Sequence, residues 1–467
     1  MNEISKPRIT FCTGVGTVTG ANFLLETPGG SNILIDCGMV QGEKVAMQEN
    51  HEEFPYDLAS IDALIITHAH LDHVGRIPKL VKEGYKGPIY STPETRELAE
   101  LVLNDAVNII AEEARREGGE PLYVAADVEK VFPLWRTVEY HKDFKVSDDI
   151  SIFLKDAGHI LGSSMIEVTV RAGEAALKIL FTGDLGNSPH PLLRDTEAIG
   201  DPDYVVMESV YGDRNHGPKE ERLQEFERVI KETIARGGTL VIPAFSLDRT
   251  QVLLYELNNL VEQGRIQSVP VFVDSPMGIK ATDVYRASTA LFNEAVRAQI
   301  SRGDDIFRFP RLQYTLTQDE SQYIDHAKGA KIILAGSGMS VGGRVVRHES
   351  RFLPDPKNTV LLVGYQAAGS LGRELADGAK KVRIHGETVK VKAKVETLYG
   401  YSAHRDSDHL VEFVAGAGGE GTGEPRLKQV FVAMGEPGAS MHLAQRLNDE
   451  LNVKAMMPER LKPYDLE

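Results

Sequence analysis

The sequence predicts an α/β protein, and three observations support this prediction. Short β-rich runs alternate with segments of helical periodicity along the whole chain, which is typical of α/β folds. Most of these runs are apolar on both faces, as expected for buried central strands. Several His and Asp residues directly follow such runs, and the carboxyl ends of strands are where open α/β sheets place their active sites.

The individual elements follow from these patterns in chain order. The runs predicted as strands are 31–36, 63–67, 177–182, 204–207, 239–243, 271–274, 331–335, 359–364 and 429–433. Helical periodicity is clearest in 93–117, 219–236, 247–263 and 437–451. Thr92 before Pro93 predicts an N-cap with proline at the first helical position, and Gly118 predicts the end of that helix. Ser246 predicts the N-cap of the third helix.

Length and composition predict a globular protein with two or three domains. The chain has 467 residues, of which 42% are hydrophobic and 26% charged, as in ordinary globular proteins. No apolar run approaches the ~18 residues that would span a bilayer, and the first residues lack a secretory signal pattern. Two cysteines exclude a disulfide framework. We therefore expect a cytoplasmic protein without membrane attachment.

The charge balance limits how this chain can hold nucleic acid. The formal net charge is −16, whereas proteins that neutralise phosphates are often basic. Binding of any nucleic acid would therefore need a local basic surface or metal ions. The segment 380–394 carries six Lys or Arg residues against one Glu and is the best candidate for such a surface. An edge strand with a charged outer face explains the same pattern equally well.

The strongest chemical signal is the sequence His68-Ala69-His70-Leu71-Asp72-His73, directly after an apolar run. His68 and His70 are two residues apart, so both project to the same side of an extended chain. After a turn, Asp72 and His73 can face a second point nearby. Zinc accepts imidazole and carboxylate ligands. A core histidine is usually a single hydrogen-bonded residue, so three His and one Asp within six positions predict a metal site.

Other residues have the placement that such a site needs. His159 lies in a loop of small residues between two strand-like runs. Asp184 follows the run 177–182, and Asp36 ends the run 31–36. Each of these is a weak signal when taken alone, because Asp-Gly turns are common in proteins.

Together these motifs resemble the metallo-β-lactamase superfamily and, within it, the β-CASP nucleases. The first four family motifs match Asp36, the run from His68 to His73, His159 and Asp184. Two further motifs match Glu208 and His404, and Gly336-Ser337-Gly338-Met339 is similar to a cleft-lining loop. The resemblance implies an αββα metallo-β-lactamase fold with an inserted α/β β-CASP domain. Residues 1–208 and 390–467 would form the first domain and 209–389 the inserted one.

The resemblance also implies a role for each matching residue. His68, His70 and His159 would bind one zinc ion, Asp72 and His73 a second, and Asp184 would bridge the two. Mn²⁺ is an expected substitute. His404 would protonate the leaving oxygen, and Glu208 would orient the His404 ring. Asp36 would orient a metal ligand, and Asp72 is expected to be catalytic as well. Contacts to the substrate backbone are expected from Ser402, Ser337, Gly338, Met339 and Arg344. Taken alone, His404 could equally be a surface histidine that caps a helix.

The sequence departs from the family pattern at Met434. RNA-cutting members carry a histidine at this position, after the last strand, and it is a ligand of the second zinc. A thioether suits Cu(I) far better than Zn(II), so Met434 is a poor replacement. His442 lies eight residues later in a predicted helix, about 9 Å or more away at ~1.5 Å rise per residue. We therefore expect the second zinc ion to bind more weakly than the first.

The leading functional hypothesis is a zinc-dependent ribonuclease that cuts single-stranded RNA. A DNA nuclease is the first alternative, because DNA-cutting relatives carry an apolar residue in place of that histidine. A non-catalytic RNA-binding subunit is the second, although the retained ligands argue against it. The long insertion between Glu208 and His404 disfavours lactam or thioester hydrolysis. Endonuclease or 5′ exonuclease action, the natural RNA and assembly into a homo-oligomer stay open.

Overall fold

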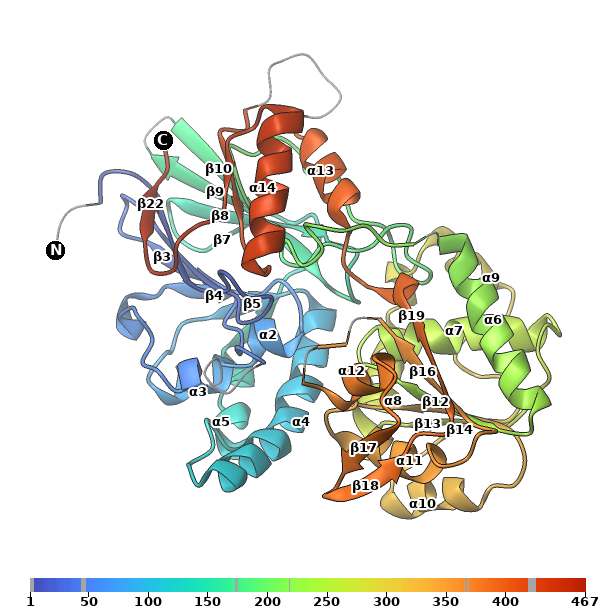
Figure 1. Ribbon diagram of the computed structural model, residues 1–467. Helices are drawn as coiled ribbons and strands as arrows, with labels where there is room; N and C mark the ends of the chain where they lie inside the picture. Colours follow the sequence, from blue (N-terminus) through green and yellow to red (C-terminus); the bar gives the residue numbers. More distant parts are fainter. Residues whose placement is uncertain are drawn as a thin grey trace. The chain divides into compact units, whose positions relative to one another are not determined.

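The computed structural model describes residues 4–42, 48–172, 175–217, 219–364, 366–367, 369–418 and 426–467. The chain divides into two compact units, one formed by Met1–Asn215 with His404–Glu467 and the other by His216–Ala403 (Figure 1). The predicted inserted segment, 209–389, starts and ends earlier than the second unit. The difference at the end arises because β19 (Lys394–Leu398) pairs in parallel with β16 (Thr359–Val363), inside the sheet of the second unit.

The first unit contains two seven-stranded sheets. One has the strand order β22-β1-β2-β3-β4-β5-β6 and the other β21-β20-β11-β10-β9-β8-β7. The strands of the first sheet are β1 (Arg8–Thr13), β2 (Asn22–Glu26), β3 (Asn32–Ile35), β4 (Ala63–Ile65), β5 (Ile89–Ser91), β6 (Trp135–Thr137) and β22 (Pro463–Asp465). Those of the second are β7 (Phe144–Lys145), β8 (Ile150–Asp156), β9 (Ser164–Ala172), β10 (Ala175–Phe181), β11 (Tyr204–Met207), β20 (Gln429–Val432) and β21 (Ala455–Met456).

The two sheets share a hydrophobic core. Phe11 of β1 lies with its ring centroid 5.4 Å from that of Phe431 in β20, and Phe23 of β2 lies 6.3 Å from Phe181 of β10. All four side chains are buried in one cluster with aliphatic residues from both sheets. Each sheet combines antiparallel strands on one side with parallel strands on the other. Because β1 comes from the start of the chain and β20 from near its end, both ends of the chain contribute to this core.

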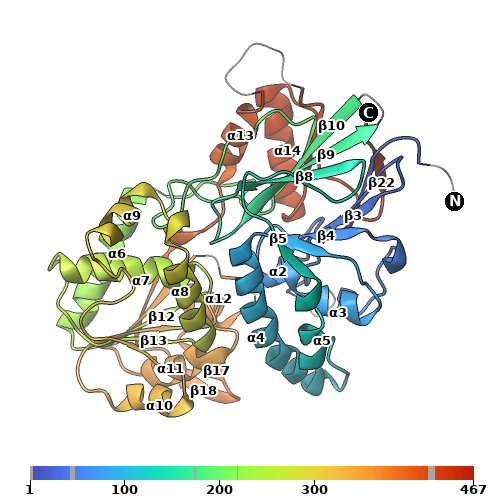
Figure 2. The ribbon, with the colours of Figure 1, turned by 180° about the vertical axis from the view of Figure 1, so that it is seen from behind.

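Helices cover the outer faces of both sheets. On the side of β4 and β5 lie α2 (Leu71–Val74), α3 (Ile77–Lys82), α4 (Pro93–Glu117) and α5 (Ala125–Glu129), as Figures 1 and 2 show from opposite sides. On the other side, α13 (Ser407–Ala415) and α14 (Pro437–Leu451) pack apolar side chains against β11 and β20. The first unit is therefore a four-layered αββα sandwich.

The second unit is a parallel sheet with surrounding helices. Its strand order is β14-β13-β15-β12-β16-β19, from β12 (Thr239–Pro243), β13 (Val271–Asp274), β14 (Leu312–Tyr314), β15 (Lys331–Ala335), β16 and β19. A separate two-stranded ribbon consists of β17 (Lys381–Ile384) and β18 (Glu387–Lys390). The helices are α6 (Lys219–Ala235), α7 (Arg249–Glu262), α8 (Pro276–Ala287), α9 (Glu294–Ser301), α10 (Gln318–His326), α11 (Gly343–Phe352) and α12 (Leu371–Ala376).

All nine predicted strands and all four predicted helices are confirmed, each with ends within two residues of the prediction. Thr92 accepts a hydrogen bond from the backbone of Thr95, and Gly118 ends α4 with φ +73°, as predicted. The predicted N-cap at Ser246 is wrong, because α7 begins at Arg249 after Asp248, and the Ser246 hydroxyl instead contacts that of Ser275 at 3.0 Å. Within the described ranges, no helix has the length and apolar character that crossing a bilayer requires.

Candidate metal centre

The His-rich motif follows β4 and is held in place by the loop that follows β3. The backbone N–H of Cys37 donates to the carbonyl of His73 at 2.9 Å, and that of Met39 donates to Leu71 at 3.0 Å. The loops approach so closely that a Cβ on Gly38 would lie 1.5 Å from the carbonyl oxygen of Asp72. Only glycine fits at that position, so this contact fixes the path of the chain through the motif.

The loop between β8 and β9 carries His159 and is fixed by two sets of hydrogen bonds. The backbone N–H of His159 donates to the Ser163 hydroxyl at 3.0 Å. The hydroxyls of Thr92, the N-cap of α4, and Thr95, in the first turn of that helix, both donate to the carbonyl of Gly162, at 2.6 and 2.8 Å. The helix start that the sequence predicts therefore also positions this histidine.

Asp184 follows β10 and lies beside the His159 loop. The backbone N–H of Gly186 donates to Ala157 at 2.8 Å. A Cβ on Gly186 would lie 1.9 Å from the carbonyl oxygen of Gly158, so a larger residue would push the two loops apart. This close approach brings Asp184 and His159 together at the same edge of the sheet.

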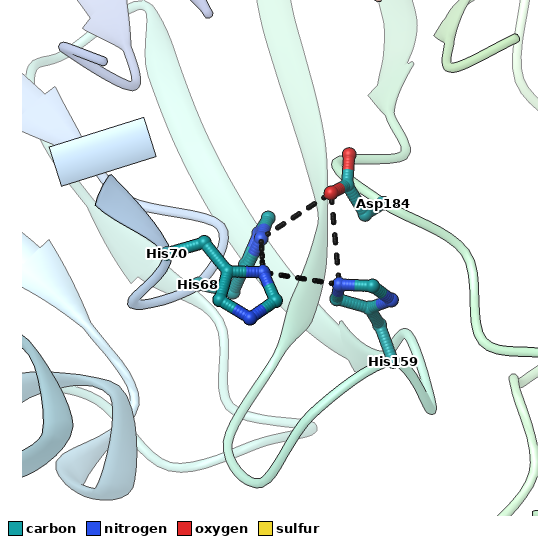
Figure 3. Close-up of side chains that lie close together, drawn as sticks. All are labelled: His68, His70, His159 and Asp184. Atoms are coloured by element: carbon teal, nitrogen blue, oxygen red, sulfur yellow. Dashed lines mark hydrogen bonds and ion pairs between the residues drawn. The ribbon is translucent and has the colours of Figure 1, made fainter. Parts of the chain in front are cut away.

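Four side chains converge on one point in the first cluster, as Figure 3 shows. His70 Nδ1 lies 3.1 Å from His68 Nε2 and 3.2 Å from His159 Nε2. Asp184 Oδ2 lies 3.4 Å from His68 Nε2 and 3.6 Å from His159 Nε2. Three ring nitrogens and one carboxylate oxygen facing each other at these distances form the donor set of a divalent metal site.

The second cluster uses the other oxygen of the same carboxylate. Asp184 Oδ1 lies 3.4 Å from His73 Nε2, and Asp72 Oδ2 lies 3.8 Å from the same nitrogen. Asp184 Oδ1 and His73 Nε2 are both buried and have no hydrogen-bond partner among the described residues. Buried polar atoms are normally satisfied, so this orphaned pair fits a cation held between them. Each oxygen of Asp184 thus faces a different cluster.

The electrostatics of the clusters suit metal binding. Burial lowers the pKa of both His68 and His159 well below the usual value, which favours the neutral imidazole that a metal requires. Burial alone would raise the pKa of Asp184, but His73 and His68 outweigh it and hold that pKa well below the usual range. Burial also raises the pKa of Asp72 to about 6. The surrounding charges therefore favour an ionised Asp184 at neutral pH.

Asp36 supports the second cluster from behind. Its Oδ2 lies 2.7 Å from His73 Nδ1, and its two oxygens accept from the backbone N–H and the hydroxyl of Thr67, both at 2.8 Å. The Thr67 hydroxyl also lies 3.1 Å from His68 Nδ1. These contacts turn the Nε2 atoms of both histidines toward Asp184. The role of Thr67 was not predicted, although its position directly before His68 was an available signal.

His404 and Glu208 form a pair next to the first cluster. Glu208 follows β11, is buried, and accepts a hydrogen bond from the backbone of Leu185 at 2.6 Å. His404 Nδ1 lies 3.1 Å from Glu208 Oε2, and the His404 ring centroid lies 4.7 Å from that of His159. Burial opposes a charge on this imidazole, but Glu208 outweighs it and raises the pKa of His404 to about 9. His404 is therefore protonated at neutral pH.

Met434 lies near the second cluster but is packed as a core residue. It follows β20 with φ +46° and is 4% exposed. A Cβ on Gly14 would lie 2.8 Å from its sulfur, so the thioether fills the space against that glycine. Met434 lines a small cavity together with His73 and Asp36. His442 is exposed on α14 and belongs to none of the converging groups in the described part of the chain.

The predicted substrate contacts lie in the second unit. Ser337, Gly338 and Met339 follow β15, and a Cβ on Gly338 would lie 2.5 Å from the ring of Phe245. Ser402 is buried directly after a 3₁₀ turn, Tyr399–Tyr401.

Arg344 is held inside the second unit by several hydrogen bonds. Its guanidinium donates to Asp274 Oδ1 at 2.7 Å and to the carbonyls of Thr315 and Leu316 at 2.9 and 2.7 Å. Its side chain is 21% exposed. These contacts indicate that Arg344 supports the loops around it.

Three family models match consecutive parts of the chain. The metallo-beta-lactamase superfamily matches residues 15–235 and the Beta-Casp domain residues 250–375. A third model, described as the Zn-dependent metallo-hydrolase RNA specificity domain, matches residues 388–458.

Relatives match over nearly the whole chain. Ribonuclease TTHA0252 of Thermus thermophilus is 38% identical over 399 residues, covering 85% of this chain and 88% of the relative. Transcription termination factor FttA is 33% identical in both Methanosarcina mazei and Pyrococcus horikoshii, covering 96% and 98% of this chain and 70% and 71% of the relatives. A crystal structure of a protein of unknown function from Enterococcus faecalis shares the fold, with a TM-score of 0.57 and 14% identity over 99% of this chain and 100% of that one.

The sequence matches and the geometry point the same way. The matched superfamily implies a divalent metal, and the clusters around Asp184 provide the ligands for one. This chain therefore belongs to the metallo-β-lactamase superfamily and, within it, to the β-CASP family of metal-dependent hydrolases.

Proposed function

We propose that this protein is a ribonuclease that hydrolyses phosphodiester bonds in single-stranded RNA with two zinc ions. The observation that supports this most directly is the placement of Asp184, whose two oxygens face two separate groups of ligands. A site with two metal ions is suited to displacement at phosphorus, since both the attacking and the leaving oxygen carry charge. The similarity to a protein named as a ribonuclease supports RNA as the substrate.

The ligands divide between the two ions. His68, His70 and His159 would hold the first, His73 and Asp72 the second, and Asp184 would contact both. When bound, the ions would acidify a water molecule and offset the negative charge on the phosphate oxygens. Mn²⁺ accepts the same nitrogen and oxygen donors and would substitute for zinc.

His404 would act as the general acid. It is protonated at neutral pH because Glu208 raises its pKa to about 9. The same contact fixes the ring through Nδ1, so the proton for the leaving oxygen would come from Nε2. Glu208 and Asp36 are positioning residues, since they act on the substrate only through His404 and His73. For the substrate backbone we propose contacts from Ser402, Ser337, Gly338, Met339 and Arg344. The Arg344 side chain is 21% exposed and also donates hydrogen bonds to Asp274, Thr315 and Leu316.

The test is cleavage of 5′-labelled RNA and of single-stranded DNA of the same sequence, with added Zn²⁺ or Mn²⁺ and the products resolved by length. RNA should be cut in preference to DNA, because only RNA offers a 2′-hydroxyl to recognise. A chelator should abolish cleavage and fresh metal should restore it. Equal rates on both substrates would favour a DNA nuclease, and RNA binding without cleavage would favour a non-catalytic subunit.

A further inference from the structure

The basic segment 380–394 forms a two-stranded ribbon with two unlike faces. The ribbon pairs β17 with β18 in antiparallel register beside α11 and α12 of the second unit (Figure 1). One face is buried in the hydrophobic core of that unit through Val382, Ile384 and Val389, which are 3%, 2% and 8% exposed. Because neighbouring residues in a strand point to opposite faces, the residues between them form the outer face. We call Lys381, Arg383 and Lys390 the basic face.

The register brings these cations close together. Lys381 pairs directly with Lys390, and Arg383 pairs with Thr388. The Cβ atoms of residues directly opposite each other in an antiparallel pair are about 5 Å apart, and residues two positions apart along one strand are about 7 Å apart. Like charges directly opposite each other destabilise a sheet, so folding alone does not account for this pair.

The basic face also lacks counter-charges. Among the residues that the structure describes, no carboxylate lies within ion-pair distance of Lys381, Arg383 or Lys390, all of which are exposed. By contrast Lys394, just after the ribbon, lies 2.9 Å from Glu232 and 2.7 Å from Glu396. In a chain with a net charge of −16, exposed cations that lack ion pairs among the described residues are available to bind an anion from outside the protein.

We propose that the basic face binds the phosphate backbone of the RNA substrate along a stretch that is not being cut. This inference rests on the proposed function for the identity of the substrate. Exposed Lys and Arg side chains bind phosphates, whereas protein partners are usually held through buried aromatic or aliphatic side chains. The outer face offers no apolar side chain, since its remaining position is Thr388. A polyanion is therefore the ligand that fits.

Such binding should be independent of base sequence and sensitive to salt. Each phosphate that a protein neutralises on single strands contributes about −0.7 to the slope of log K against log salt concentration. Three cations on the basic face should therefore contribute about −2 to that slope.

The test compares two triple variants in binding to a fluorescent uridine homopolymer about 30 nucleotides long. The first is Lys381→Gln, Arg383→Gln, Lys390→Gln. The matched control is Arg302→Gln, Lys328→Gln, Lys357→Gln, three exposed cations from separate loops with the same total change in charge. Binding is followed by anisotropy with metal-free protein over a series of salt concentrations. The first variant should bind about tenfold or more weakly with a slope shallower by about 2, and the control should match the unmodified protein.

The outcomes separate this inference from the proposed function. Unchanged affinity and slope in the first variant, or an equal loss in the control, would overturn the role of the basic face even if the unmodified protein cuts RNA. Binding that depends on Lys381, Arg383 and Lys390, with no cleavage of RNA by the unmodified protein when Zn²⁺ or Mn²⁺ is added, would overturn the proposed function and leave the basic face intact. Binding of an acidic protein with no effect on RNA would also count against the inference.

Discussion

Asp184 Oδ1 and His73 Nε2 lie 3.4 Å apart, and each is buried without a hydrogen-bond partner among the described residues. The other oxygen of the same carboxylate faces His68 and His159. This division of one carboxylate between two groups of ligands is the geometric basis for proposing two metal ions. We expect the second group to bind a metal ion more weakly than the first, because three histidines surround the first point and only His73 the second.

Removing a ligand of the first cluster should remove both metal and activity. We expect His68→Ala to contain little zinc and to cut RNA at the rate of the metal-free protein, because no other described side chain can replace a buried ligand there. Elemental analysis measures the metal directly. His442→Ala is the control, since this exposed histidine lies outside the clusters and should retain full occupancy. Full zinc content in His68→Ala would rule out its assignment as a ligand.

The role of His404 as the general acid is tested by measuring both the cleavage rate and the metal content of a variant. His404→Ala should keep its zinc and lose roughly 10²–10⁴ in single-turnover rate, the usual contribution of a general acid. His409→Ala, in the same segment but 44% exposed, should behave as the unmodified protein. If His404→Ala cut RNA at the full rate, another group would have to donate the proton to the leaving oxygen.

The same pair predicts how the rate depends on pH. Glu208 raises the pKa of His404 to about 9, so the acid form is present below that pH and is lost as the pH rises through it. The rate should fall as the pH rises through about 9, where half of the acid form is lost. Glu208→Gln removes the carboxylate that raises this pKa, so the fall should move to lower pH. A pH profile that is identical in the two proteins would show that Glu208 does not act through His404.

Met434 predicts a weak second site. Purified protein should contain clearly less than two zinc ions per chain, and added Zn²⁺ or Mn²⁺ should raise the rate. Met434→His should tighten the second site, because histidine tolerates the local φ of +46° and the side chain lines a cavity with His73. Met434→Leu keeps the apolar packing without a ligand and should not tighten it. Two tightly held zinc ions before any substitution would show that the missing histidine is unnecessary.

Glu349 predicts a pH-dependent stability in the second unit. Burial raises the pKa of Glu349 to about 7 from the usual 4.5, while the Ser340 hydroxyl donates to it at 2.5 Å. The folded state thus holds this proton more tightly than the unfolded state, so stability falls as the pH rises from about 4.5 to about 7 and stays lower above that.

Replacing this glutamate should remove the effect. Glu349→Gln should match the unmodified protein at pH 4 and be more stable by about 3 kcal/mol at pH 8, measured by urea unfolding. Glu374→Gln, on an exposed residue of α12, is the control and should change neither value. Equal stabilities for the Glu349→Gln and unmodified proteins at pH 8 would mean that Glu349 is ionised there without cost.

The sequence predicted the elements that carry strong local signals. The central strands are apolar on both faces, and α4 has an N-cap, a proline and a closing glycine, so these elements could be identified from short windows. The strand β8 was indicated only as one of the two strand-like runs that flank His159, and its bounds were not predicted. Its buried residues Ile150, Ile152 and Leu154 alternate with half-buried ones such as Lys155. Such a strand depends on its neighbours, here β7 and β9, for its register.

The metal site was predictable in part, because some of its residues lie close together in the sequence. His68 to His73 form a local motif, and its spacing alone indicates a metal. The topology of the two sheets brings four more residues to this motif: Asp36, His159, Asp184 and His404. The sequence indicated that these residues meet only through the family resemblance. Thr67 directly precedes His68 in the sequence, but its role was not predicted, because its bonds to Asp36 form only where β3 and β4 lie side by side.

Whether Asp184 contacts two metal ions can be measured by anomalous diffraction at the zinc edge from crystals grown with zinc. We expect two peaks that both contact the Asp184 carboxylate. The stronger should lie among His68, His70 and His159, and the weaker beside His73 and Asp72. A single peak, or two peaks of which one lies away from Asp184, would contradict this expectation.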